Sequence, residues 1–496
     1  MTAHIEMAKH RVEAHCPSCA GGAPRPAKIA IIGGGFSGTL VLANLVADAR
    51  TTEIDLFEAR DDCGPGTAYR TRDRVHLLNV RADRMGAMEP EDFCRWLKTE
   101  RGRQACAEFS PGRVVEATDY APRALYGCYL KDLLARTLDI AKRRGVRVRI
   151  VRAAVTDMVL HKDGLEIVAD GTRSKASLAI LATGNFPPRP LAALSRAAQR
   201  SPRYVADPWR AGTALADRVG RLPRKSTILI FGTGLTAVDC VLSLCARGFD
   251  GKIIAVSRHG RLPLAQREGA RIPWTLTIPP GDVAPSARAL FAWLKREARL
   301  AEAEGAGWRS VFDAVRPFAQ RLWCTLNTAE RLKALRLLPL WNIHRHRMAP
   351  LAHARIEELR ATGRLEIRAA HCSSVERRLG GFAVRLRCKG AQGDETIRSA
   401  LVLNCTGPEH DLAQLDDPLL KNLLRRGLIM RSRVGGIVAR DSVVAEGRNA
   451  GRIFAVGPLL VGELLETTAA PELRELARHA AKLVPAQLAW HSAVLG

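Results

Sequence analysis

The chain has 496 residues, 47% of them hydrophobic, which is enough for two or three folded domains and excludes a largely disordered protein. The formal net charge of +26 is an unusual excess of Lys and Arg, a feature of proteins that bind nucleic acid, membranes or small anions. The basic residues are scattered and form no block that alternates with aromatic residues. We therefore expect no nucleic-acid partner, and an attraction of anionic cofactors and substrates instead.

Residues 1–27 carry charges and histidines without an apolar core, so we expect a flexible tail and no signal peptide. The tail contains Cys16 and Cys19, a CxxC pair typical of a redox dithiol or of half a zinc site. No second CxxC completes such a site and no strand precedes this one, so we favour a tail without chemistry and expect no metal. The 12 cysteines are mostly isolated, which favours a reducing, cytoplasmic location.

A nucleotide-binding pattern follows at residues 28–58. It consists of an apolar strand, a glycine-rich turn, a helix to about residue 49, and a second strand. Each glycine has a physical role: Gly33 permits the sharp turn, Gly35 lets backbone N–H groups approach a pyrophosphate, and Gly38 lets the helix pack on the strand. The pattern therefore predicts a βαβ unit that binds a dinucleotide.

Two further features support this prediction. Phe36 and Ser37 complete the turn, and the helix that follows offers a positive dipole end to phosphates. Glu58 ends the second strand, where a carboxylate can accept hydrogen bonds from ribose hydroxyls. The uncharged run 29–47 is as long as a membrane span, but its glycines fit a turn and not a bilayer helix, so we expect no membrane insertion.

The next region is predicted to form helices and then strands. The patterns indicate a turn-rich loop at 61–69, helices at 91–100 and 126–144, and strands at 146–151, 154–160, 165–169 and 178–182. We expect a small antiparallel meander before a buried strand, whose tip, Thr183 and Gly184, could touch the cofactor. Prolines 187, 188 and 190 then indicate a linker.

The βαβ pattern repeats from residue 226. A strand at 226–231, a helix to about residue 247 and a strand at 252–256 enclose a GxGxxA turn, made by Gly232, Gly234, Leu235, Thr236 and Ala237. Here the acid is replaced by Ser257 and Arg258, which would bind a 2′-phosphate that an acid would repel. We therefore expect this second site to prefer NADPH to NADH, although Arg258 could also be an ordinary surface arginine.

Residues 284–348 are helical in pattern and end in a cluster that contains His344, Arg345 and His346. These side chains could bind an anionic substrate or move protons, and they are our candidates for the catalytic side of the site. A solvated basic turn at a helix end is the alternative. Residues 364–407 then have the pattern of strands again, like residues 146–182. The chain closes with a strand that ends at Gly457 and a helix from about residue 468.

The sequence thus predicts an α/β protein with two Rossmann-like dinucleotide-binding domains and a helical insertion. We expect the tail at 1–27, the first domain at 28–190 and 396–496, the second domain at 222–395, and the insertion at 284–348.

Several motifs resemble a known family of two-domain flavoproteins. They lie at 66–69, 78–80 with Met85, 207–209, 345–348 and 466–474. The arrangement is similar to the FAD/NAD(P)-binding proteins typified by YdhS, which are related to flavin-dependent N-hydroxylating monooxygenases. The resemblance covers roughly residues 28–485.

The resemblance implies that FAD occupies the first site and NADPH the second. It further implies that Asn79, Met85 and Thr183 lie near the FAD and that the loop after Gly457 passes the flavin ring. The chain departs from many flavoproteins because Pro458, not an acid, follows Gly457. The paired redox cysteines of disulfide reductases are also missing, since Cys63 stands alone.

The function that the resemblance implies is an FAD-dependent, NADPH-linked monooxygenase that uses O2 to hydroxylate a nitrogen or sulfur of a small anionic substrate. An NADPH-linked flavin reductase or dehydrogenase without oxygen insertion is one alternative. A cofactor-binding sensor without enzymatic activity is another. The sequence leaves the substrate and the oligomeric state open.

Overall fold

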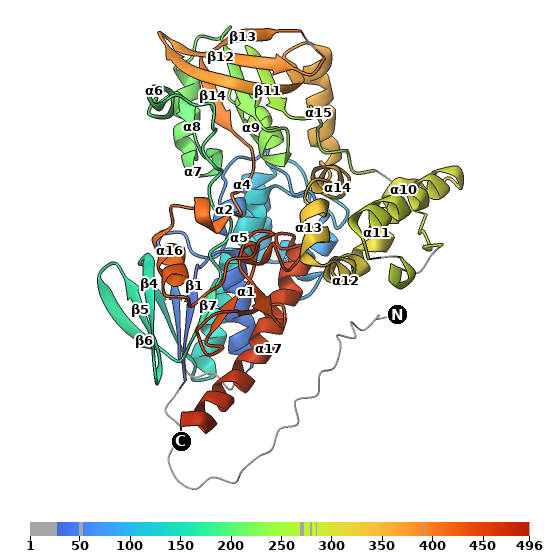
Figure 1. The fold of residues 1–496 in the computed structure, drawn as a ribbon. Coiled ribbons are helices and arrows are strands. Elements are labelled where there is room, and N and C mark those ends of the chain that lie inside the picture. Colours follow the sequence, from blue (N-terminus) through green and yellow to red (C-terminus); the bar gives the residue numbers. More distant parts are fainter. Residues whose placement is uncertain are drawn as a thin grey trace.

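The computed structural model describes residues 27–48, 53–267, 272–277, 280–283, 285–390 and 392–495. Cys16 and Cys19 of the predicted tail lie outside these residues. Two seven-stranded sheets and one three-stranded sheet form the framework. Figure 1 shows the first large sheet in the lower half of the molecule, the second in the upper half, and a group of helices to one side between them.

The first large sheet has the order β15–β16–β17–β7–β1–β2–β3. Its strands are β1 (Lys28–Ile32), β2 (Glu53–Phe57), β3 (Arg147–Val151), β7 (Leu178–Leu181), β15 (Ala439–Arg440), β16 (Val444–Ala445) and β17 (Ile453–Ala455). The strands from β17 to β3 pair in parallel. Their carboxyl ends therefore meet at one edge, where open α/β sheets bind ligands.

Alternate residues of β1 enter two different cores. Ile29 and Ile31 pack with α1 (Phe36–Ala47), α5 (Arg123–Arg143) and α17 (Ala470–Leu495) on one face. Ala30 and Ile32 face the opposite core, which contains side chains of α16 (Pro418–Arg425). Because both faces are covered, β1 and β7 are buried along almost their whole length, which explains their continuous apolar sequences.

The three-stranded sheet packs on the second of these cores. It is antiparallel and consists of β4 (Val155–His161), β5 (Gly164–Ala169) and β6 (Thr172–Ala176). The expected meander is thus present, but the strand expected at 146–151 is β3 of the main sheet. The sequence analysis also missed β6, whose Thr-Arg-Ser-Lys-Ala sequence is mostly exposed and lacks an apolar pattern.

The second large sheet has the order β13–β12–β11–β10–β9–β14–β8. Its strands are β8 (Tyr204–Val205), β9 (Thr227–Phe231), β10 (Lys252–Ser257), β11 (Leu365–Arg378), β12 (Gly381–Cys388), β13 (Asp394–Ser399) and β14 (Leu401–Asn404). β8, β14, β9, β10 and the start of β11 pair in parallel. Beyond an irregularity between Cys372 and Ser374, β11 continues into an antiparallel ribbon with β12 and β13. This sheet also takes in β8 and β14, which lie outside residues 222–395.

Helices cover the second sheet and fill the insertion. The sheet is flanked by α6 (Arg196–Gln199), α7 (Pro208–Ala211), α8 (Thr213–Gly220), α9 (Leu235–Ala246) and α15 (Pro350–Ala361). The insertion consists of α10 (Ala287–Ala303), α11 (Trp308–Val315), α12 (Ala319–Thr325), α13 (Thr328–Ala334) and α14 (Leu338–Arg345), and Trp293, Phe312 and Trp341 lie in its own core. The expected helical insertion is therefore confirmed.

Shorter helices lie between β2 and β3: α2 (Gly66–Tyr69), α3 (Asp92–Leu97) and α4 (Glu100–Phe109). The helix expected at 91–100 is α3, and α4 was not predicted. Lys98 and Thr99 separate the two helices. The hydroxyl of Thr99 accepts a hydrogen bond from the backbone N–H of Gly102 as the N-cap of α4. Within the described residues, no helix combines the length and the apolar character that a membrane span needs.

Candidate functional site

The first glycine turn lies between β1 and α1, at the carboxyl edge of the first sheet. Gly33 has a φ of +108°, and a Cβ atom there would lie 2.3 Å from the carbonyl oxygen of Ala182. A Cβ atom on Gly38 would lie 1.9 Å from the carbonyl oxygen of Gly33. These two positions therefore require glycine for the steric reasons that the sequence indicates.

The N-terminus of α1 is suited to an anion. Phe36 and Ser37 form its first turn, which contains no acidic residue, and Gly35 supplies no side-chain cap. The first N–H groups of a helix have no intrahelical partners, and the helix dipole favours negative charge there. The structure thus offers backbone donors to a diphosphate at the predicted place.

Glu58 follows β2 and points at the same turn. Its Oε2 accepts a hydrogen bond of 2.9 Å from the backbone N–H of Gly34, and its Oε1 accepts one of 3.2 Å from the N–H of Arg60. The carboxylate is therefore fixed beside the glycine turn, where the ribose of a bound dinucleotide is expected.

A loop covers this first turn. The N–H of Gly64 donates a hydrogen bond of 2.7 Å to the carbonyl of Gly34, and a Cβ atom on Gly35 would lie 3.1 Å from the Cα of Gly66. The thiol of Cys63 donates to the same carbonyl of Gly34. Burial, aided by the charge of Glu58, raises the pKa of Cys63 to about 11, so this thiol is a poor nucleophile near neutral pH.

The ends of three neighbouring strands meet at this turn. Thr183 follows β7, and its hydroxyl oxygen is buried without a hydrogen-bond partner among the described residues. Gly457 follows β17 with a φ of +102°, and a Cβ atom there would lie 3.3 Å from Oγ of Ser37. Gly184 has a φ of +71° and open space around it. An unsatisfied buried hydroxyl beside a glycine-lined edge fits a bound ligand such as FAD.

The structure places Asn79 and Met85 differently from each other. The carbonyl of Asn79 accepts a hydrogen bond of 3.0 Å from Nε2 of Gln266, which belongs to the second half of the chain. Met85 is only 3% exposed and lies in the core that includes α1 and α5. Its carbonyl accepts a hydrogen bond of 2.6 Å from the hydroxyl of Tyr126. That either residue contacts FAD stays a prediction.

The second glycine turn repeats the construction of the first. The N–H of Gly232 donates a 2.8 Å hydrogen bond to the carbonyl of Val256, just as Gly33 donates one of 2.8 Å to Phe57. Gly232 has a φ of +104°, and a Cβ atom there would lie 2.1 Å from the carbonyl of Cys405.

The surroundings of the second turn are more open than those of the first. A Cβ atom on Gly234 would meet nothing within 4 Å, whereas its counterpart Gly35 is covered. Leu235 begins α9, whose first turn lacks acidic residues, and Ala237 is buried against the sheet. Thr236 accepts a 3.3 Å hydrogen bond from Nε1 of Trp209. The described atoms thus leave space directly over this turn.

Ser257 and Arg258 stand at the end of β10, where the sequence places them. The hydroxyl of Ser257 accepts a 3.0 Å hydrogen bond from the N–H of Gly260 and lies 3.0 Å from the hydroxyl of Thr233. Ser257 thus ties the turn to the loop after β10. Arg258 is exposed, and its side chain forms no hydrogen bond or ion pair with the described residues.

In the histidine–arginine cluster at the end of α14, Arg345 is buried, while His344 and His346 are half-buried. Arg345 is 9% exposed and lies within 3.1 Å of Glu466 and 3.4 Å of Glu472. Glu472 also receives two hydrogen bonds from Arg316. His344 stacks on Phe312, and burial lowers the pKa of His346. Arg345 therefore already has two carboxylate partners, and a catalytic role for the cluster stays a prediction.

Sequence reasoning missed a set of contacts between the two glycine-turn regions. Arg123 at the start of α5 lies 2.9 Å from Asp239 on α9, and Nε2 of His76 lies 2.6 Å from the hydroxyl of Ser243. Arg247 pairs with Asp73. The partners are far apart in the sequence, so no local pattern indicates these contacts. These contacts fix the two glycine-turn regions relative to each other.

Comparisons with known proteins agree with this geometry. Residues 30–186 match a family described as FAD-NAD(P)-binding. Over 228 residues the chain is 24% identical to the uncharacterized protein YdhS of Escherichia coli (strain K12), a match that covers 44% of this chain and 39% of that relative. The chain therefore spans less than half the length of the curated relative it matches.

Solved structures resemble nearly the whole chain. Ornithine hydroxylase (PvdA) from Pseudomonas aeruginosa has a TM-score of 0.62 at 16% identity, covering 93% of this chain and 99% of that one. L-lysine 6-monooxygenase from Pseudomonas syringae has a TM-score of 0.61 at 18% identity, covering 93% and 100%. Bacillithiol disulfide reductase from Staphylococcus aureus has a TM-score of 0.53 at 12% identity, covering 93% and 98%.

At these identities the structures establish the fold and not the reaction. The chain has the two-domain FAD/NAD(P)-binding flavoprotein fold, and its first glycine-turn region matches the FAD-NAD(P)-binding family.

Proposed function

We propose that the chain is an FAD-dependent, NADPH-linked monooxygenase that hydroxylates a nitrogen, or a sulfur, of a small substrate. The observation that carries this proposal is the pair of glycine turns of equal construction, each at the carboxyl edge of its own parallel sheet. Bound flavin, reduced by the nicotinamide of NADPH, supplies the reaction with O2. The chain itself supplies binding, orientation and the exclusion of water.

The difference between the two turns supports the assignment of the cofactors. The first turn is covered by the loop that contains Gly64 and Gly66, which suits a cofactor that stays bound, such as FAD. The second turn is open over Gly234, which suits NADPH, because a reductant must enter and leave in each catalytic cycle.

The identity of the second cofactor rests on Ser257 and Arg258. An exposed guanidinium that has no partner among the described residues is available to pair with a 2′-phosphate, and Ser257 holds the loop in which it stands. Arg258→Ala should therefore weaken NADPH binding about tenfold or more, while NADH binding changes little. The exposed Arg221→Ala is a matched control. Equal losses for NADPH and NADH would refute the phosphate assignment.

The cysteines of the described residues offer no reactive dithiol of the kind that a disulfide reductase uses. A disulfide reductase needs a reactive dithiol, but Cys63 beside the first turn has a raised pKa of about 11. Among the described residues, no second cysteine is hydrogen-bonded to Cys63. Cys240 and Cys405 do lie 3.7 Å apart, but both are buried, and the contact with Cys240 together with burial raises the pKa of Cys405.

Relatives of the same fold suggest the substrates to test. Structures of similar fold include the ornithine hydroxylase, the L-lysine 6-monooxygenase and a cadaverine monooxygenase, DfoA from Erwinia amylovora. We propose a small amine for this chain. Cadaverine lacks the carboxylate of ornithine and lysine, so the three compounds also test the expectation of an anionic group on the substrate.

The test is NADPH oxidation by the FAD-loaded protein in air, with mass analysis of the product. The proposal predicts that an amine stimulates NADPH oxidation and yields a product heavier by one oxygen atom, in an amount that matches the O2 consumed. Turnover only with another electron acceptor under anaerobic conditions would favour the reductase alternative. A flavin-bound protein that never oxidises NADPH would favour the sensor.

A further inference from the structure

A groove of about 890 Å³ lies on the antiparallel ribbon of β11, β12 and β13, away from both glycine turns. It borders Ser226 and Thr227 at the start of β9, whereas Gly232 of the second turn follows the end of that strand. Six residues of extended chain separate these positions by about 20 Å. The groove is therefore distinct from the proposed cofactor sites, and its volume is in the range of small-molecule sites.

The register of the ribbon explains why the surface is hollow. On the groove face, Ala383 lies opposite Arg398, Arg385 lies opposite Thr396, and Gly381 lies opposite Arg378. The floor is therefore made of small residues, while arginines stand around it. The other face of β12 carries Phe382, Val384 and Leu386, which belong to the core.

Two arginines of the groove form no direct ion pair with the described residues. Further along the same face, Arg387 lies opposite Asp394 and forms a 2.7 Å ion pair with it. At the corresponding positions in the groove, Arg385 and Arg398 face Thr396 and Ala383 instead of acids. Neither arginine side chain forms a hydrogen bond or ion pair with the described residues. Their positions are diagonal neighbours on two paired strands, so their charges repel, and an anion between them would relieve this repulsion. Asp394, which is diagonal to Arg385 on the other side, already interacts with Arg387 and only in part with Arg385.

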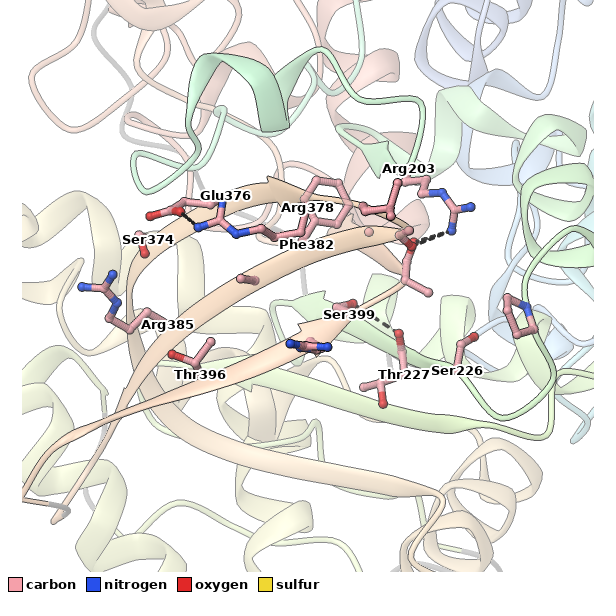
Figure 2. A pocket seen from close by; sticks show the side chains of 17 residues that line it. Arg203, Ser226, Thr227, Ser374, Glu376, Arg378, Phe382, Arg385, Thr396 and Ser399 are labelled. Atoms are coloured by element: carbon pink, nitrogen blue, oxygen red, sulfur yellow. Dashed lines mark hydrogen bonds and ion pairs between the residues drawn. The ribbon is translucent and has the colours of Figure 1, made fainter.

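The remaining polar groups of the groove also favour an anion. Its only acid is Glu376, which is paired with Arg378. Ser374 lies opposite Arg385 and can donate a hydroxyl hydrogen bond. At the other end, the hydroxyl oxygen of Ser226 is buried without a partner among the described residues. Figure 2 shows Arg385, Thr396 and Ser374 together at one end of the groove, with Arg203 and Ser226 at the other.

We propose that this groove binds an oligophosphate anion, with one phosphate held by Arg385, Arg398 and Thr396. Bidentate contact with phosphate is the geometry that arginine prefers. The groove offers no exposed aromatic side chain on which a base could stack, because Phe382 is only 2% exposed. The site therefore recognises phosphate groups, whether they belong to a free oligophosphate or to a nucleoside triphosphate.

The test is a calorimetric titration of the full-length protein with sodium tripolyphosphate at near-physiological salt. The variant with Arg385→Gln and Arg398→Gln should bind at least about tenfold more weakly than the wild type, because two charge-assisted contacts are lost. The matched control carries Arg288→Gln and Arg299→Gln, two exposed arginines of α10 with the same change in net charge. The control should bind like the wild type.

The outcomes separate the proposal from its rivals. Equal affinity of the groove variant and the wild type would overturn it, as would an equal loss in the control, which would indicate only a general charge effect. A parallel titration with ATP identifies the source: equal affinity for ATP and tripolyphosphate means that only phosphates are recognised, and tighter ATP binding means that a nucleoside adds contacts. Both results support the site. Retained flavin content and thermal stability of the groove variant show that it is folded.

Discussion

Arg123 and Asp239 form an ion pair of 2.9 Å that joins the first glycine-turn region to the second. The two side chains are only 12% and 8% exposed. Arg123 also lies over the ring of Trp209 and donates a 3.0 Å hydrogen bond to the carbonyl of Leu77. A buried pair of this kind fixes the first glycine-turn region relative to the second.

We expect Asp239→Asn to lower the free energy of unfolding by about 3 kcal/mol, because the substitution leaves a buried guanidinium without its counter-charge. Bound flavin should be retained, while its reduction by NADPH should slow, since Asp239 lies on α9 of the second site. Urea unfolding and stopped-flow reduction measure the two effects. Asp217→Asn on α8, which is exposed, is the control; a similar loss there would show that the effect is not specific to the pair.

His76, which lies in the same region, makes the free energy of unfolding depend on pH. Burial lowers the pKa of His76 from its ordinary value of 6.5, although Asp239 and Asp73 oppose the shift. The unfolded chain therefore binds a proton at this residue at a higher pH than the folded protein does. The stability that neutral His76 contributes is complete above about pH 6.5 and is lost as the pH falls below that value.

Unfolding midpoints in urea between pH 8 and pH 5 test this dependence. His76→Gln should reduce the loss of stability on acidification, and His161→Gln, an exposed position at the end of β4, should not. Burial also lowers the pKa of other partly buried histidines such as His346, so part of the dependence should remain in the His76 variant. An unchanged slope in the His76 variant would contradict the assignment.

Two glycine substitutions should have opposite effects. Gly33→Ala forces a Cβ atom to 2.3 Å from the carbonyl of Ala182 at a φ of +108°, so the variant should lose flavin or fail to fold. Gly234→Ala meets no protein atom within 4 Å and has a φ of −78°, so it should fold and keep flavin. Its Cβ atom would instead occupy the space expected for the pyrophosphate of NADPH.

Flavin absorbance and the KM for NADPH distinguish these cases. The account predicts a colourless or insoluble Gly33→Ala protein, and a yellow Gly234→Ala protein with a KM for NADPH raised about tenfold or more. A Gly234→Ala protein with a wild-type KM would mean that the nucleotide does not lie over this turn.

A substitution at the buried hydroxyl of Thr183 should affect FAD binding and the stability of the fold differently. Because this oxygen has no hydrogen-bond partner among the described residues, Thr183→Val should leave the apoprotein equally stable or make it more stable. If FAD satisfies the hydroxyl, the same substitution should weaken FAD binding about tenfold. Flavin titration of the apoprotein and its thermal unfolding measure the two quantities. Unchanged FAD affinity would remove Thr183 from the site.

The sequence predicts the two βαβ units well because their signals are local. The positive φ of Gly33 and Gly232, and the close packing at Gly38, follow from residue types within a few positions of each other. β6 was missed because its Thr-Arg-Ser-Lys-Ala sequence lies mostly in solvent and needs no apolar alternation.

Long-range polar contacts could not be predicted from the sequence. Arg345 was expected at an anionic substrate, but its carboxylate partners Glu466 and Glu472 lie more than 100 residues later in the chain. The pair of Arg123 and Asp239 is equally remote. A single sequence shows which charged residues exist, but the fold decides which of them meet and are neutralised.

The most direct measurement is the visible absorbance of the flavin after the purified, FAD-loaded protein is mixed with NADPH under anaerobic conditions. The account predicts a yellow protein whose flavin is bleached by NADPH much faster than by NADH, and whose absorbance returns when O2 is admitted. A correctly folded protein that takes up no flavin, or whose flavin NADPH does not reduce, would contradict it.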